Sequence, residues 1–133
     1  MTIRAYTDYR EEEILRLYGA VGWTAYTRDP GALREGYRRS LLVLGAWEGE
    51  ELLGVVRAVG DGCTIVFVQD LLVFPEHQRK GVGSALLREI LARYREVRQI
   101  ALVTDDSPRT LAFYKSLGLV PLSELGCVGF LRA

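Results

Sequence analysis

The sequence predicts an α/β fold of one domain, in which an antiparallel β-meander precedes a β-α-β unit. Apolar runs separated by glycine-containing turns follow one another in the first half of the chain. In the second half an apolar run, a helical pattern and another apolar run follow in turn. The 133 residues leave room for a single domain, residues 1–133. We therefore expect an α+β arrangement, with a mixed central sheet of about seven strands flanked by about four helices.

The elements of the first half follow from capping signals and turn residues. Asp8 with Glu11 is a capping box that predicts a first helix, and Asp29-Pro30 supplies an N-cap and a first-turn proline for a second. Turns at Glu48-Gly49-Glu50 and Gly60-Asp61-Gly62 separate three apolar runs. The expected strands of this half are residues 2–7, 41–47, 52–59 and 63–73.

The second half contains a crossover and a closing hairpin. A helix over Gly83–Tyr94, with one apolar stripe, lies between the preceding strand and the apolar run Gln99–Thr104, which implies a right-handed crossover. Ser107-Pro108 begins a further helix. Two short apolar runs then predict a last hairpin, formed by Leu119–Leu122 and Cys127–Leu131.

Composition excludes several classes of function. The formal net charge is zero, which gives no support for binding nucleic acid or an anionic membrane. No segment approaches the roughly 20 apolar residues of a membrane span, and no signal peptide is visible, so we expect a cytoplasmic protein. Cys63 and Cys127 are too few for a metal or disulfide framework, and we expect each in the core. His77 is the single histidine, and no metal site is expected.

The stretch between the expected strand 63–73 and the helix Gly83–Tyr94 has the features of a phosphate site. It reads Gln78-Arg79-Lys80-Gly81-Val82-Gly83-Ser84. Glycines allow the backbone N–H groups to approach an anion, and the helix that follows adds its positive N-terminal end. A dinucleotide fingerprint would need a third glycine where Leu86 stands, and a P-loop would need Gly-Lys-Ser/Thr. A nucleotide-phosphate binder is therefore disfavoured.

The stretch from Gln78 to Gly83 resembles the acyl-CoA-binding motif of the GNAT superfamily of N-acetyltransferases. That motif reads Gln or Arg, two residues, Gly, one residue, then Gly or Ala, and it is matched in full. Downstream, Ala112–Leu119 resembles the later helix of the family, which ends in an aromatic-Tyr pair shortly before Gly and an apolar residue. The two matches together cover about Val66 to Leu119.

The resemblance implies acetyl-CoA as co-substrate. Its pantetheine arm would lie where the strands ending near Val73 and Thr104 splay apart. Ser107 and Thr110 stand where the family often has Asn and Ala, although Ser107 still offers a hydroxyl. The residues expected to bind the co-substrate are Leu71, Leu72, Val73, Gln78, Arg79, Lys80, Gly81, Val82, Gly83, Ser84, Ser107 and Tyr114.

Direct transfer from a thioester to an amine requires two proton transfers: the leaving thiolate must gain a proton, and the amine must lose one. Resemblance to the family assigns Tyr114 to protonate the leaving thiolate, a step that a tyrosine hydroxyl can perform. Phe67 stands where the histone-modifying branch has its glutamate base, so that base cannot be carried over. Asp70 is the candidate base, or else a structural or solvent-facing carboxylate, because it lies on the face opposite Gln69 unless a β-bulge re-aims it.

The acceptor side is the least specified part of the chain. Trp23, Tyr26 and Tyr37 lie between the first helices, a region that in the family usually helps to form the acceptor pocket. Their rings could stack on an aryl or cationic amine, or belong to the core. We expect Trp23, Tyr26 and Gln69 to contact the acceptor.

The sequence thus predicts an N-acetyltransferase acting from acetyl-CoA on a primary amine of a small molecule or a protein. The alternative is a non-catalytic acyl-CoA-binding or sensing module on the same fold. Val128 and Phe130, on the last expected strand, could pair with a second copy in a homodimer.

Overall fold

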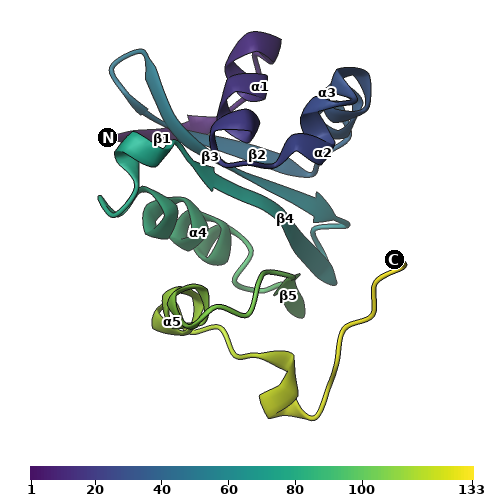
Figure 1. The fold of residues 1–133 in the computed structure, drawn as a ribbon. Coiled ribbons are helices and arrows are strands. Elements are labelled where there is room, and N and C mark those ends of the chain that lie inside the picture. The colour runs from purple at the N-terminus through teal and green to yellow at the C-terminus, as the bar shows by residue number, and fades with distance from the viewer. The chain divides into compact units, whose positions relative to one another are not determined.

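The structure, a computed structural model, describes residues 1–133 as two compact units, 1–101 and 102–133, each of which is described by itself. A five-stranded sheet runs in the order β1-β2-β3-β4-β5 (Figure 1). The strands are β1 (Thr2–Ala5), β2 (Leu42–Glu48), β3 (Glu51–Gly60), β4 (Ile65–Val73) and β5 (Gln99–Leu102). The first unit also contains α1 (Glu11–Ala20), α2 (Thr24–Thr27), α3 (Pro30–Arg38), the 3₁₀ turn η1 (Pro75–His77) and α4 (Val82–Arg93). The second unit contains α5 (Pro108–Ser116) and the 3₁₀ turn η2 (Leu122–Leu125).

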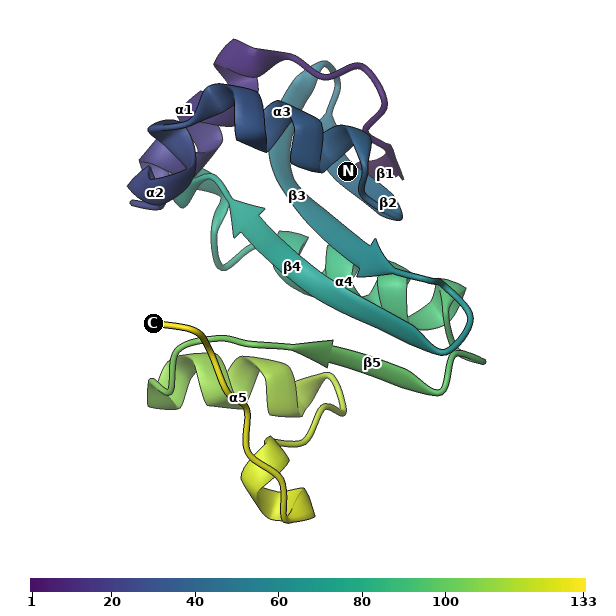
Figure 2. The ribbon, with the colours of Figure 1, turned by 90° about the vertical axis from the view of Figure 1, so that its right-hand side faces the viewer.

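Strands β2, β3 and β4 form the predicted antiparallel meander, and β1 adds a further antiparallel strand beside β2 (Figure 2). The β3–β4 turn is held by Asp61, whose Oδ1 atom accepts the backbone N–H groups of Cys63, Thr64 and Ile65 at 2.8, 2.8 and 3.0 Å. Strand β5 follows α4 and lies next to β4, where the Gln99 N–H donates to the Thr64 carbonyl at 3.1 Å. The predicted order of strand, helix and strand is confirmed.

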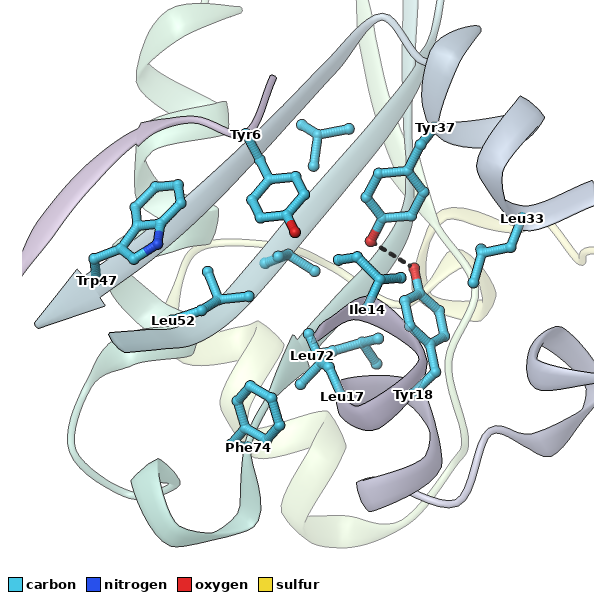
Figure 3. Packing of buried hydrophobic residues seen from close by; sticks show 12 residues of the cluster. Tyr6, Ile14, Leu17, Tyr18, Leu33, Tyr37, Trp47, Leu52, Leu72 and Phe74 are labelled. Atoms are coloured by element: carbon cyan, nitrogen blue, oxygen red, sulfur yellow. Dashed lines mark hydrogen bonds between the residues drawn. The ribbon is translucent and has the colours of Figure 1, made fainter. Parts of the chain in front are cut away.

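Helices cover both faces of the sheet. Helices α1 and α3 pack on one face and α4 on the other (Figure 1). On the first face Ile14, Leu17 and Leu33 pack against the strand residues Val55 and Leu72 (Figure 3). On the second face α4 buries four apolar side chains, which are Val82, Leu86, Leu87 and Ile90. The amphipathic patterns in the sequence therefore correspond to these two interfaces.

A β-bulge interrupts the pairing of β3 with β4. Arg57 pairs with Asp70, but the next residue, Ala58, pairs with Val68, so that Gln69 is an extra residue in β4. Adjacent strand residues point to opposite faces, so Val68 and Asp70 lie on opposite faces although they are two residues apart. The bulge therefore turns Asp70 toward the helices α1 and α3.

The beginning of the chain departs from the prediction in two places. Helix α1 begins after Arg10, which makes no side-chain cap, and Asp8 forms an exposed ion pair with Arg10, so the predicted capping box was wrong. The one-turn helix α2 was not predicted because four residues are too few to show a helical period. The N-cap of α3 by Asp29 is confirmed, because its Oδ1 atom accepts the Ala32 N–H at 3.1 Å.

The predicted last hairpin is absent, so the sheet has five strands where about seven were expected. Pro121 lacks the N–H that a ladder needs, and η2 follows it. Cys127–Leu131 has no regular structure, and Val128 and Phe130 are 72% and 94% exposed. The two short apolar runs therefore predicted strands that have no pairing partner in this structure.

Gly54→Ala tests how tightly the end of β4 is held against β3. A Cβ at Gly54 would lie 2.5 Å from the Leu72 carbonyl oxygen, which is backbone and cannot turn away. We expect a loss of about 1–3 kcal/mol in the free energy of unfolding, measured by urea denaturation. Gly19→Ala is the control, since a Cβ there meets nothing within 4 Å, and stability should be unchanged or slightly raised. Equal effects of the two substitutions would contradict this account.

Candidate active site

The loop Gln78–Ser84 joins η1 to α4 and contains two residues with positive φ. Arg79 has φ 64°, the only non-glycine residue of the chain in that region, and Gly81 has φ 83°. A non-glycine residue in this conformation costs about 1–3 kcal/mol, a strain that typically marks a functional loop. Gly81 is also the N-cap of α4, which begins without any side-chain cap. The first N–H groups of α4 are therefore available to a ligand.

The surroundings of Gly81 fit a phosphate. A Cβ at this residue would meet no atom within 4 Å, so open space adjoins the helix N-terminus. Arg79 and Lys80 are both exposed beside it and supply positive charge. Alternating backbone conformations before a helix direct successive N–H groups toward one concavity, which suits an anion such as a pyrophosphate.

Gln78 ties this loop to the end of β4. Its Nε2 atom donates to the Val73 carbonyl at 3.1 Å, a structural contact that the motif did not reveal. The Phe74 N–H donates to Leu53 on β3. By the alternation of an antiparallel ladder, the N–H groups of Leu71 and Val73 then point to the other edge of β4.

That edge of β4 extends past β5. Strand β5 has four residues and begins level with Thr64, so it is too short to run beside Leu71 and Val73. Leu72, expected among the co-substrate residues, is 2% exposed and contributes its side chain to the core. The N–H donors that can reach a ligand here belong to Leu71 and Val73.

A buried polar network surrounds Asp70. Its Oδ2 atom accepts from Arg57 Nε and from the Tyr18 hydroxyl, each at 2.7 Å. The Tyr18 and Tyr37 hydroxyls are 3.0 Å apart (Figure 3). Since Tyr18 uses its one proton on Asp70, Tyr37 is the donor in that second bond. Asp70 is 1% exposed, and its Oδ1 atom is buried without a hydrogen-bond partner.

Burial controls the ionisation of this network. Burial raises the pKa of Tyr18 far above its usual value, and the negative charges of an ionised Tyr37 and of Asp70 raise it further. Burial would lower the pKa of Arg57, but the charge of Asp70 and the hydrogen bond to it outweigh burial and raise it. Tyr18 is therefore a neutral hydroxyl and Arg57 a cation.

Two further aromatic rings, those of Trp23 and Tyr26, lie beside this network. Trp23 and Tyr26 are stacked, with centroids 6.1 Å apart and an interplanar angle of 24°. Tyr18 lies 5.1 Å from Tyr26. Gln69, the extra residue of the bulge, donates its Nε2 to the Tyr26 hydroxyl at 2.9 Å. The expected acceptor residues Trp23 and Gln69 are thus both in contact with the third, Tyr26, whereas Tyr37 belongs to the core.

The sequence model of the acetyltransferase (GNAT) family matches residues 4–119. The chain belongs to the GNAT acetyltransferase family. A solved GNAT-family acetyltransferase from Streptococcus pneumoniae TIGR4 is 38% identical with a TM-score of 0.89, and the match covers 99% of this chain and 96% of that one. The ribosomal-protein-S18-alanine N-acetyltransferase of Escherichia coli, 19% identical with a TM-score of 0.72 over 88% of this chain and 76% of that one, shares the fold.

Curated relatives are longer than this GNAT domain. The ycf52-like N-acetyltransferase of Prochlorococcus marinus, described as uncharacterized, is 27% identical over 112 residues, which are 80% of this chain and 60% of the relative. The chain spans 38% and 42% of two further relatives, from Gracilaria tenuistipitata and Gibberella zeae.

Two predicted site residues of this GNAT domain lie in the second unit, on and before α5. Ser107 caps α5 as predicted, since its side chain accepts the Thr110 N–H at 3.3 Å. Burial raises the pKa of Tyr114, the charge of Asp105 raises it further, and a hydrogen bond with Thr104 acts in the opposite direction. The Tyr114 hydroxyl therefore keeps its proton at neutral pH, as a proton donor must.

Other titratable groups lie outside this arrangement. Cys63 and Cys127 are both exposed, so the prediction that they are core residues was wrong.

No group of three or more His, Cys, Asp and Glu side chains is placed to hold a metal ion. None of the helices is both long and apolar enough to span a membrane. A cavity of about 500 Å³, lined by Gly62, Cys63 and residues 93–97, lies at the end of α4 remote from the loop Gln78–Ser84.

Arg57→Met tests the buried pair. The substitution leaves Asp70 buried without its cation, and we expect a loss of about 3–5 kcal/mol in the free energy of unfolding by urea denaturation. Arg38→Met removes the exposed ion pair with Glu35 and should leave the unfolding midpoint nearly unchanged. A loss below 1 kcal/mol for Arg57→Met would show that Asp70 is not held as an ion in the core.

Proposed function

We propose that this GNAT protein transfers an acetyl group from acetyl-CoA directly to a primary amine. The observation that carries the proposal is the loop at the start of α4, where the strained Arg79 and the open Gly81 prepare an anion site. The loop is tied through Gln78 to the end of β4, whose edge carries the N–H groups of Leu71 and Val73. Family membership supports acyl transfer, and these features support the donor.

Different residues of the loop Gln78–Ser84 would contribute hydrogen-bond donors and positive charge to acetyl-CoA binding. The N–H groups of Gly81, Val82, Gly83 and Ser84 would donate to phosphate oxygens at the positive end of α4. The exposed Arg79 and Lys80 would add charge there. When bound, acetyl-CoA supplies a thioester, whose carbonyl an amine can attack without a covalent protein intermediate.

The chain contributes placement and proton transfer. Holding both reactants in attack geometry can supply about 7–11 kcal/mol of the barrier. The N–H groups of Leu71 and Val73 would donate to the carbonyl oxygen as its negative charge grows. As the new C–N bond forms and the C–S bond breaks, the Tyr114 hydroxyl would give its proton to the leaving sulfur.

The proton of the amine is a separate problem. An alkylamine with a pKa of about 10.4 loses its proton at pH 7 only at a cost of about 4.6 kcal/mol. Asp70 is a constrained candidate for the base, because its Oδ2 atom already accepts from Arg57 and Tyr18. Only its buried Oδ1 atom is without a partner. We therefore propose that the amine reacts in its neutral form, with Asp70 as the alternative base.

Binding of acetyl-CoA tests the donor. At one hundred times the dissociation constant, ligand stabilises the fold by about 2.7 kcal/mol, a melting shift on the order of 10 °C for this size. Gly81→Val should weaken binding at least about 100-fold in calorimetry, because a branched side chain would occupy the anion site. Gly49→Val is the matched control, since Gly49 also has positive φ and open surroundings but lies in the β2–β3 turn. Equal affinity of the two variants for acetyl-CoA would show that the loop does not bind it.

Tyr114→Phe tests the proton donor and separates an enzyme from a sensing module. The substitution removes one hydroxyl and keeps the ring, so turnover should fall about 10²–10⁴-fold with the affinity for acetyl-CoA unchanged. Tyr94→Phe, at the far end of α4, is the control and should turn over normally. Full activity of Tyr114→Phe would mean that water protonates the thiolate. Absence of turnover in the wild type with every amine would favour the module.

A further inference from the structure

We infer that the acceptor is an arylamine, uncharged at neutral pH, whose ring stacks on the Trp23–Tyr26 pair. This inference rests on the proposed acetyl transfer and names its substrate class. It follows from the exposure of Trp23, from the link between Tyr26 and the bulge, and from the charges around the two rings.

Trp23 offers an aromatic face that the fold leaves open. It is 39% exposed, whereas Trp47, the other tryptophan, is 8% exposed and packs in the core. Tyr26 stacks on Trp23, and Tyr18 supports both rings at angles of 60° and 68°. Tyr18 is itself fixed by its hydrogen bond to Asp70. The pair is therefore a preformed surface for a planar ring.

The bulge connects this surface to the reaction site. The Tyr26 hydroxyl accepts the hydrogen bond from Gln69, which is two residues before Leu71 in β4. The Gln69 Oε1 atom remains as an acceptor for an amine N–H. A ring on Trp23 and Tyr26 would thus place an amino group beside the N–H donors of β4.

The charges at this surface favour a neutral amine. Gln69 carries no charge, and the Asp70 carboxylate is neutralised by Arg57 at 2.7 Å. Carboxylates of the adjoining helices are engaged elsewhere, because Asp29 caps α3, Glu13 accepts from Tyr6 and Glu11 pairs with Arg34.

Glu35 of α3 is paired with Arg38 and Arg39, and the Arg16 guanidinium lies over the Phe74 ring. Glu12 and Arg28 are the charged residues that remain. Glu12 lies in the first turn of α1, at the end of the helix remote from Trp23. Arg28, at the end of α2, would repel a cation. An ammonium group would meet no free anion beside the rings, and an alkylamine of pKa about 10.4 is neutral in only about 1 molecule in 2500 at pH 7.

The reaction balances without a protein base. The neutral nitrogen uses its lone pair to form the C–N bond, the C–S bond breaks, and the nitrogen then loses one proton to water. The sulfur takes the proton of Tyr114, which water restores. The products are an N-aryl acetamide and the free thiol.

The test compares two isomeric amines, 4-methylaniline and benzylamine. The first has its amino group on the ring and the second on a methylene, so size and composition are equal. We expect kcat/KM at pH 7 to be at least about 100-fold higher for 4-methylaniline. Its rate should be flat from pH 6 to 9, whereas that of benzylamine should rise about tenfold per pH unit over the pH range in which it is mostly protonated. The opposite preference would overturn the inference.

Substitutions at the ring pair test the stacking. Trp23→Leu and Tyr26→Leu should raise the KM for 4-methylaniline at least about tenfold, with unchanged affinity for acetyl-CoA. Tyr26→Phe keeps the ring but loses the hydrogen bond from Gln69, so its KM should rise less than that of Tyr26→Leu. An unchanged KM in both leucine variants would show that the two rings do not contact the acceptor.

Binding supplies a readout apart from turnover. With CoA present, 4-methylaniline should quench the tryptophan fluorescence of the wild type, and Trp23→Leu should abolish the change. Acetylation of benzylamine but not of 4-methylaniline would refute the inference and leave the proposed function standing. Acetylation of no amine, together with no quenching, would refute both.

Discussion

The extra residue in β4 determines how the two faces of the sheet are used. In a regular strand Val68, Asp70 and Leu72 would all point to the face that α4 covers. Because Gln69 is inserted, Asp70 and Leu72 instead face α1 and α3. A β-bulge therefore moves a carboxylate out of one apolar interface and into a place where Arg57 and Tyr18 can bond it.

Burying the Arg57–Asp70 ion pair costs free energy of desolvation. Removing two charges from water is expensive, and an apolar pair of similar volume is often as stable or more so. Here the pair fixes the register of β3 against β4 and orients Tyr18, which supports Tyr26. Its contribution is thus to the position of neighbouring groups, and the same bonds leave Asp70 a constrained proton acceptor.

The sequence predicted the features that depend on local pattern. The caps by Asp29 and Ser107 were predicted because they are short-range signals. The spacing of Gly81 and Gly83 marked the loop before α4, and its role as a phosphate site stays a prediction. The bulge was foreseen only as a condition on Asp70, since one extra residue leaves no mark on composition. The final strands were wrongly expected because a short apolar run does not show whether a pairing partner exists.

Five consecutive residues of β4 meet all the demands placed on this site. Asp70 and Leu72 point inward, and they anchor the strand by an ion pair and by apolar packing. Leu71 and Val73 direct their N–H groups to the outer edge, next to a loop that carries positive charge. Gln69 is neutral and lies beside aromatic rings. Anionic and neutral ligand groups would therefore be separated along one strand, which suits the proposed transfer of an acetyl group from a charged donor to an uncharged nucleophile.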